Sequence, residues 1–349
     1  MMNFSVDEQE HESTTTLTST PYQHLLVCPR CRGALESDEA VLTCRSCSYP
    51  FPIQRGIPLL YWPNDPKLFT DDVTEVVRAF YEEHPFPDYE DTDNLAHLID
   101  KARQGVFARL LDEQIPFGTR VLDCGCGTGQ LANFLGIAHR TVFGTDICLN
   151  SLRLAQEFKQ KNRLERVHFL QMNLFRPVFR PASFDTVICN GVLHHTSHPP
   201  LGFETLSTLV KPSGYLIVGL YHRYGRLATD LRKILFQVTG YRLAFLDPRL
   251  RSQQLGKTRQ SAWFADQYEN PHELKHTISE VVNWLEPSQL ELVKTIPKTR
   301  LLNRFSPNER LFEPEPSGHL LERSLIELGM ILNGSSEGGF FTVIARKKP

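Results

Sequence analysis

The sequence predicts an α/β fold, in which a mostly parallel sheet carries helices on both faces. From Thr119 onward, short apolar and β-branched runs alternate with stretches whose apolar residues have helical spacing. Such alternation is typical of parallel strands joined by helical crossovers. Four cysteines close together near the N-terminus predict a second, much smaller module.

The elements of the sheet domain follow in order along the chain. Strands are expected at 120–124, 141–145, 168–172, 184–189, 215–221, 290–296 and 340–346. Helices are expected between them at 130–135, 149–161, 201–210, 278–285 and 320–332. The alternation stops twice, so the stretches 223–277 and 297–338 are interpreted as insertions into a domain that covers 119–349.

The first third of the chain divides into three parts. Residues 1–22 are acidic and rich in Ser and Thr, which predicts a disordered tail. Residues 23–62 form the cysteine module. Residues 63–118 are a helical linker or cap, with one helix at about Thr70–Tyr81 and another at about Asn94–Gln114.

Composition and charge exclude several classes of protein. The chain has 349 residues, of which 41% are hydrophobic and 22% charged, so it has enough apolar material for a core. The net charge of −2 provides no overall basic field for nucleic acid. No apolar run approaches the ~18 residues of a membrane span. The N-terminus lacks the basic and apolar regions of a signal peptide, so we expect a cytoplasmic protein with no transmembrane segment.

The cysteine module has the spacing of a metal site. It reads Cys-x2-Cys-x12-Cys-x2-Cys, so that each Cys-x2-Cys pair can present two thiolates from one tight turn. Two such turns complete a tetrahedral Zn²⁺ site with no open position, which predicts a structural role. The expected ligands are Cys28, Cys31, Cys44 and Cys47.

A glycine-rich loop follows the first strand of the sheet domain. The segment VLDCGCGTGQLANFL places Asp123 at the end of the strand, followed by Gly125, Gly127 and Gly129. The third glycine of a dinucleotide fingerprint is missing, because Gln130 occupies its place. This acidic-G-x-G-x-G pattern resembles the class I S-adenosylmethionine-dependent methyltransferases. The later segment SFDTVICNGVLHH resembles the type-11 group of that family.

The resemblance implies a Rossmann-like sheet of strand order 3-2-1-4-5-7-6, whose last strand is antiparallel. It also implies S-adenosylmethionine as cofactor. Asp146 ends the second strand, where a carboxylate would accept both ribose hydroxyls. The family usually has an acidic residue after the third strand, but this chain has Asn173, whose amide oxygen could accept from the adenine amine. The expected cofactor-binding residues are Asp123, Gly125, Cys126, Gly127, Gly129, Asp146, Ile147, Asn173, Leu174 and Asn190.

The candidate catalytic residues lie at strand ends and before the domain. Ligands of open α/β sheets bind beyond the carboxyl ends of the strands. A general base is needed only when the acceptor carries a proton at its nucleophilic atom. The candidates are His194 and His195 after the fourth strand, Tyr221 and His222 after the fifth, and Tyr81 in the stretch AFYEEHPFPDY. The N/D-P-P-Y motif of methyltransferases that act on DNA amines is absent from the fourth strand.

The insertion 223–277 differs in charge from the rest of the chain. It holds ten Lys or Arg against five Asp or Glu, a net of +5, so the remainder carries −7. One helical face within it is apolar, formed by Tyr224, Leu227, Leu231, Ile234, Leu235 and Val238. The insertion is either a substrate cap or a solvated helix packed through that face.

Three hypotheses for function remain open at this point. The first is methyl transfer to a small-molecule or lipid-type acceptor. The second is an RNA methyltransferase, for ribosomal or transfer RNA, in which the zinc module and the basic insertion hold the nucleic acid. The third is a non-catalytic, cofactor-binding scaffold. The zinc module resembles Trm112-like ribbons, which implies docking on the catalytic domain, on a protein partner or on RNA.

Overall fold

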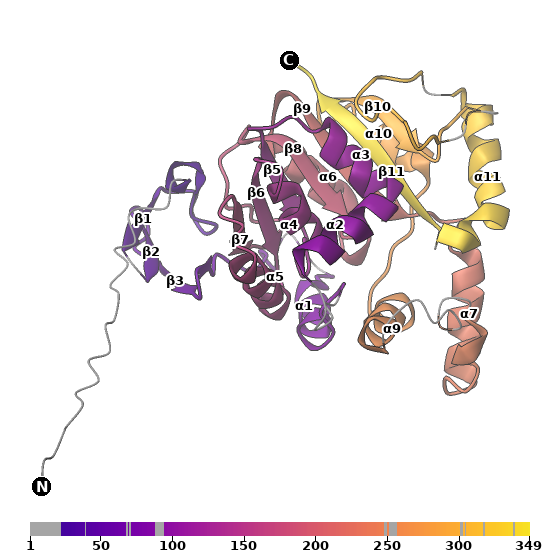
Figure 1. Cartoon of the computed structure of the whole chain (residues 1–349), viewed down its shortest axis with the longest axis horizontal. Helices are drawn as coiled ribbons and strands as arrows, with labels where there is room; N and C mark the ends of the chain where they lie inside the picture. The colour runs from indigo at the N-terminus through magenta and orange to yellow at the C-terminus, as the bar shows by residue number, and fades with distance from the viewer. Residues whose placement is uncertain are drawn as a thin grey trace, which may run out of the picture.

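The computed structural model describes residues 22–38, 40–67, 69, 71–87, 94–247, 250, 257–300, 303, 305–316, 318–337 and 339–349 (Figure 1). The expected tail, 1–22, lies outside these residues except for Tyr22. That side chain is buried, with its ring edge-on to Phe143 at a centroid distance of 5.1 Å. The described chain therefore begins as part of the core.

A seven-stranded sheet forms the centre of the molecule (Figure 1). Its strands are β5 (Arg120–Cys124), β6 (Thr141–Asp146), β7 (Val167–Gln171), β8 (Phe184–Asn190), β9 (Val210–Tyr221), β10 (Leu290–Ile296) and β11 (Phe340–Lys347). Their spatial order is β10-β11-β9-β8-β5-β6-β7, with β11 antiparallel to both neighbours and β5 to β9 parallel. The predicted order 3-2-1-4-5-7-6 and the antiparallel last strand are confirmed.

Helices cover both faces of this sheet. One face packs against α2 (Leu95–Gln104), α3 (Val106–Gln114), α4 (Gln130–Gly136) and α5 (Leu149–Lys161). The other packs against α6 (Pro199–Leu209), α10 (Ile278–Asn283) and Met330 of α11 (Leu320–Glu337). Successive strand residues point to opposite faces, so Val121 belongs to the first core and Leu122 to the second.

The linker departs from the sequence prediction at one point. The single helix expected over Asn94–Gln114 is two helices, α2 and α3, because Gly105 has an extended backbone (φ −79°, ψ 106°). Glycine favours such a break, since it loses more backbone freedom in a helix than other residues do. The first linker helix, α1, covers Thr74–Glu83.

The cysteine module is a small antiparallel sheet that joins the central core. It contains η1 (Gln23–Leu25), β1 (Leu35–Asp38), β2 (Val41–Cys44), β3 (Pro50–Gln54) and β4 (Ile57–Pro58), in the order β1-β2-β3-β4. The backbone of Leu60 donates to the carbonyl of Gln171 in β7 (3.1 Å), and Val27 donates to the carbonyl of Val178 (2.8 Å). Phe51 of the module is buried in the same apolar cluster as Leu122 of the sheet.

The insertion after β9 does not bury the apolar helix face that the sequence pattern indicates. Its elements are α7 (Leu227–Val238), η3 (Ala244–Leu246), α9 (Lys257–Phe264) and the π-helical turn η4 (Ala265–Glu269). On α7, Phe236 is fully buried against Phe264 and Tyr268. Of the two interpretations of the insertion, the one in which this helix packs through its apolar face is wrong: the exposed large side chains on α7 are Leu227, Leu231, Ile234, Leu235 and Val238.

Candidate functional site

A cavity of about 580 Å³ lies beyond the carboxyl ends of β5 to β9. This is the edge of an open α/β sheet at which ligands bind. The volume falls in the range of small-molecule and cofactor sites. Its walls come from every strand end of the parallel part of the sheet, from α1 and the following Phe86 and Pro87, and from the insertion through Trp263, Asp266 and Gln267.

The glycine loop forms the floor of this cavity in a conformation that needs glycine. Gly125, Gly127 and Gly129 all have positive φ, of 75°, 52° and 71°. The loop also lies against other parts of the chain: a Cβ on Gly125 would meet Val192 at 2.2 Å, and one on Gly127 would meet the carbonyl oxygen of Phe86 at 2.1 Å. A side chain in this loop would therefore collide with the protein itself, before any ligand is considered.

Two carboxylates stand side by side at the cavity floor. Asp146 accepts the backbone N–H groups of Gly127 and Cys148, each at 2.8 Å, so each of its oxygens keeps a lone pair for a ligand. Burial raises the pKa of Asp146, and burial together with the charge of Asp146 raises the pKa of Asp123 to about 7. Neither carboxylate forms an ion pair within the described residues. A ligand that brings hydroxyl groups and positive charge fits this floor.

Most of the cofactor-binding residues expected from the sequence are brought to the cavity. Its lining includes Asp123, Gly125, Cys126, Gly127, Asp146, Ile147, Asn173, Leu174 and Asn190. Gly129 does not line it and instead begins α4 in the left-handed conformation. S-adenosylmethionine, which carries a ribose, an ammonium and a sulfonium, matches the donor and charge requirements of the two carboxylates.

The side chain of Asn173 makes three hydrogen bonds that the sequence did not indicate. Its side-chain nitrogen donates to the carbonyl of Trp62 (3.0 Å) and to Oδ1 of Asn64 (2.8 Å), and its oxygen accepts from the backbone N–H of Phe175 (3.0 Å). The amide thus ties the chain leaving the cysteine module to the cavity wall. One lone pair on the oxygen remains for the predicted adenine contact.

His195 is the histidine that faces the cavity. Its Nδ1 lies 2.8 Å from the carbonyl oxygen of His272, so Nδ1 carries the hydrogen and donates it. Nε2 then holds a lone pair, and no hydrogen bond to it is found among the described residues. Burial lowers the pKa of His195, which keeps the imidazole neutral near pH 7. The side chain has the geometry and protonation state of a general base.

The other two histidine candidates lie outside the cavity. His194 is fully buried, with its ring 4.1 Å from that of Tyr221 and a pKa held well below its ordinary value by burial. His222 is also fully buried, between the rings of Tyr224 and Phe341. Strand alternation explains this last placement, because Tyr221 lines the cavity and the next residue points to the opposite face.

A buried polar network connects the remaining candidates to the insertion. The hydroxyl of Tyr81 donates to Asp266 (2.8 Å) and accepts from Asn270 (2.9 Å). Gln267 donates both to Asp266 (2.9 Å) and to the hydroxyl of Tyr221 (2.7 Å). The sequence did not indicate Asp266 or Gln267 as site residues, since polar residues at irregular spacing carry no pattern.

Arg226 closes this network beneath Tyr221. Its guanidinium lies 3.9 Å from the centre of the Tyr221 ring and pairs with Glu273 at 2.7 Å. Both charged side chains are buried, so the pair stabilises this arrangement only while both partners are present. α1, β9 and the insertion therefore meet around one polar cluster at the cavity mouth. The Tyr81 segment and the insertion thus lie on the same side of the sheet, beyond the strand ends, and Tyr89 lies outside the described residues.

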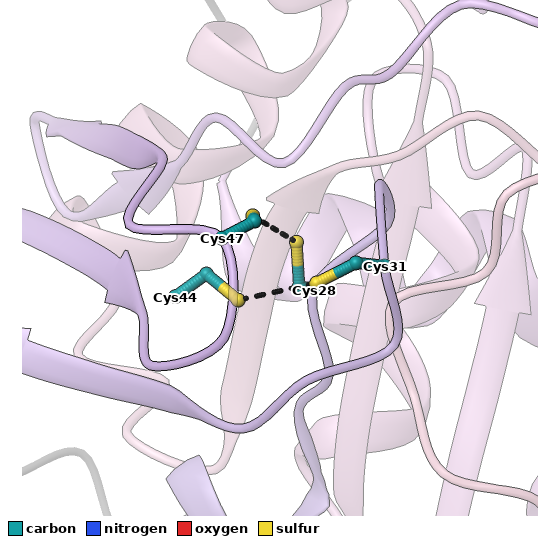
Figure 2. A group of neighbouring side chains, drawn as sticks. All are labelled: Cys28, Cys31, Cys44 and Cys47. Atoms are coloured by element: carbon teal, nitrogen blue, oxygen red, sulfur yellow. Dashed lines mark hydrogen bonds between the residues drawn. The ribbon is translucent and has the colours of Figure 1, made fainter.

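The four cysteines of the N-terminal module converge as a metal site (Figure 2). All four sulfurs lie within 4.8 Å of one another, with 3.4 Å between Cys31 and Cys44 and 3.8 Å between Cys28 and Cys47. Zn–S bonds of ~2.3 Å in a tetrahedron separate the sulfurs by ~3.8 Å.

The two cysteine turns repeat one geometry. Arg32 donates its backbone N–H to Cys28 (2.8 Å), and Ser48 donates its own to Cys44 (2.9 Å). Both donors have positive φ, of 65° and 55°. All eight cysteines of the chain are free thiols in this structure. The donor set and its shape fit Zn²⁺.

Family models match both the sheet domain and the cysteine module. Residues 122–218 match the model described as "Methyltransferase domain", and residues 24–56 match "Trm112p-like protein". The chain thus contains a methyltransferase domain and a Trm112-like domain. None of the helices in the described part of the chain is both long and apolar enough to cross a membrane.

Two curated relatives illustrate the range of similarity. The uncharacterized protein syc1184_c of Synechococcus sp. is 27% identical over 247 residues, which cover 63% of this chain and 59% of that protein. A ubiquinone biosynthesis O-methyltransferase of Paracidovorax citrulli is 31% identical over 153 residues, which cover 44% of this chain and 63% of the relative. The chain thus spans about three fifths of the length of these relatives.

Among solved structures, the magnesium protoporphyrin IX methyltransferase of Synechocystis PCC 6803 with bound SAH has a TM-score of 0.45 at 17% identity. That match covers 78% of this chain and 99% of the other. A complex between the Haloferax volcanii Trm112 methyltransferase activator and a methyltransferase has a TM-score of 0.43 at 12% identity. It covers 73% of this chain and 97% of the other.

Proposed function

We propose that this chain, which contains a methyltransferase domain, transfers a methyl group from S-adenosylmethionine to a hydroxyl group of a small, largely apolar acceptor. The observation that carries the proposal is His195: a neutral imidazole at the cavity wall whose Nδ1 is committed to a backbone carbonyl and whose Nε2 is open. Such a group is needed where the acceptor atom carries a proton.

The cofactor would be held by the floor of the cavity. Asp146 is expected to accept the ribose hydroxyls, and Asp123 to lie near the positive charge of the ligand. When bound, S-adenosylmethionine supplies an electrophilic methyl group on sulfur. The contribution of the chain is to hold the acceptor oxygen in line and to remove its proton.

His195 would take that proton on Nε2, becoming an imidazolium. The hydrogen on Nδ1 stays bonded to the carbonyl of His272, which orients the ring throughout. The negative charge of Asp266 stabilises the protonated ring. Tyr81, held by Asp266 and Asn270, would position the acceptor.

The walls of the cavity favour an apolar acceptor over RNA. Above the carboxylate floor the cavity is lined by Val77, Phe86, Met172, Leu174, Val192, Trp263 and Phe340. In the insertion, Arg223, Arg226, Arg232 and Lys275 are all paired with Asp or Glu, which leaves these cations poorly placed for phosphates. The curated relatives named above include a ubiquinone biosynthesis O-methyltransferase, which by its name methylates an oxygen atom, the atom proposed here.

The test uses S-adenosylmethionine with a tritiated methyl group and fractionated cell extract. Label is expected in the solvent-extractable pool. His195→Gln should lower turnover by ~10²–10⁴-fold with cofactor affinity unchanged. The matched control His319→Gln changes an exposed histidine and should keep full turnover. With the base removed, the residual rate should rise with pH as the acceptor hydroxyl ionises.

The other hypotheses have distinct outcomes in the same experiment. Label that enters RNA instead would support the RNA methyltransferase. Cofactor binding without transfer to any fraction would support the scaffold.

A further inference from the structure

The outer side of the insertion exposes an apolar surface. We define the docking face as the exposed large apolar side chains of residues 227–246: Leu227, Leu231, Ile234, Leu235, Val238, Tyr241, Phe245 and Leu246. Leu231 is 69% exposed, Ile234 58% and Val238 81%, so these are not residues at the edge of a core. Contiguous exposed apolar surface of this kind marks a binding site for another molecule.

A second helix extends this surface. α11 contacts α7, and Figure 1 shows the two helices one above the other at the same edge of the molecule. α11 also exposes large apolar side chains, namely Leu320, Leu321, Leu325, Leu328 and Ile331. Two neighbouring helices at this edge thus leave their apolar residues uncovered.

The charges on and after the docking face are mainly basic. Among residues 227–246, the charged residue with a strongly exposed side chain is Arg242, and no Asp or Glu there is equally exposed. The sequence that follows, 247–259, adds Arg249, Arg251, Lys257 and Arg259 against a single acid, Asp247. That acid is already paired with Arg232. An apolar helix face that is followed along the sequence by a basic segment is typical of a helix that lies in an anionic membrane surface.

We propose that the docking face binds the surface of an anionic phospholipid bilayer, with α7 lying in the interface. A protein or RNA partner is less well matched, since the exposed large side chains are apolar and offer few hydrogen bonds. The docking itself does not depend on the reaction of the cavity.

The inner side of the same insertion borders the cavity. Phe236, on the side of α7 opposite the docking face, packs on Phe264 and Tyr268. That layer continues into Trp263, Asp266 and Gln267, which line the cavity. If the proposed function holds, an acceptor dissolved in the bilayer would meet the protein one helical layer away from the site; this step rests on that function.

Vesicle flotation tests the docking with the full chain and without turnover. The protein is expected to float with phosphatidylcholine vesicles that contain phosphatidylglycerol, and to float less with phosphatidylcholine alone or at high salt. The double variant Leu231→Glu/Ile234→Glu should lower the bound fraction at least tenfold. As a control, Phe117→Glu places one carboxylate on an exposed apolar residue elsewhere and should float like the wild type. Circular dichroism and calorimetry with S-adenosylmethionine verify that each variant is folded.

The possible results separate clearly. Wild-type protein that does not float, or a double variant that floats as well as wild type, overturns the proposal. A wild-type dimer in light scattering that the double variant converts to monomer, without vesicle binding, would assign the face to contact between two copies. Failure of methyl transfer with flotation intact would count against the proposed function and not against the docking.

Discussion

The two additions to the sheet domain are attached in opposite ways. The Trm112-like module has its own sheet, is joined to the β7 edge by backbone hydrogen bonds, and buries Leu26, Leu42 and Phe51 in the core of the domain. The insertion after β9 buries polar groups around Arg226 and leaves its apolar helix face uncovered. The difference teaches that the first addition completes the core, whereas the second presents a surface and a cavity wall.

The largest expected effect comes from the metal site of the first addition. Replacing Cys28 by Ser should remove zinc, and structural zinc contributes on the order of 10 kcal/mol to the folding of small modules. Because the module shares its core with the sheet, the melting temperature of the whole chain should fall. Elemental analysis and calorimetry measure both effects. Cys189→Ala, a buried cysteine of β8, should keep one zinc per chain. Full stability without zinc would contradict a structural site.

A matched pair of substitutions compares the two additions directly. Phe51→Ala in the module removes a fully buried ring and should cost about 3–5 kcal/mol of unfolding free energy. Leu231→Ala on α7 removes an exposed side chain and should change it by about 0.5 kcal/mol or less. Urea unfolding without membranes measures both. Equal losses would mean that α7 is buried in solution, for instance by a second copy.

The carboxyl group of Asp123, at the floor of the cavity, makes the stability of the protein depend on pH. The pKa of Asp123 is raised to about 7, so the folded protein holds this proton more tightly than the unfolded chain. Its contribution to stability is present below pH ~4 and is lost as pH rises towards 7, with an upper limit of about 4 kcal/mol. Asp123→Asn should therefore be more stable than wild type at pH 8 and equal to it at pH 4. Thermal melts across this range decide it, and a constant difference would refute the raised pKa.

Features with a repeating pattern were predictable from the sequence. The seven strands and their order follow from alternation and from the family resemblance, and the cysteine cluster follows from spacing. The placement of Asp146 at the cavity follows from its position at a strand end.

Features that depend on packing were not predictable. Three histidines were equivalent in the sequence, and only the fold separates His195 from His194 and His222. One of the two interpretations of the insertion had the apolar face of α7 packed, yet that face is exposed. A helical pattern shows which residues share a face but not what covers them. Asp266 and Gln267 reach the cavity from a segment far along the chain, at a distance that no local pattern encodes.

The aromatic cluster under the Trm112-like module has a consequence for how this protein evolved and folds. Tyr22, before the module, packs against Phe143, which packs in turn against Phe179 and Phe184. The two segments, 24–56 and 122–218, match separate family models, yet side chains from both lie in one apolar cluster. A truncated protein without the N-terminal segment would expose these aromatic rings on one face of the sheet domain. The limits of the two family matches therefore do not coincide with the limits of one cooperative folding unit. We expect the two segments to unfold in a single thermal transition.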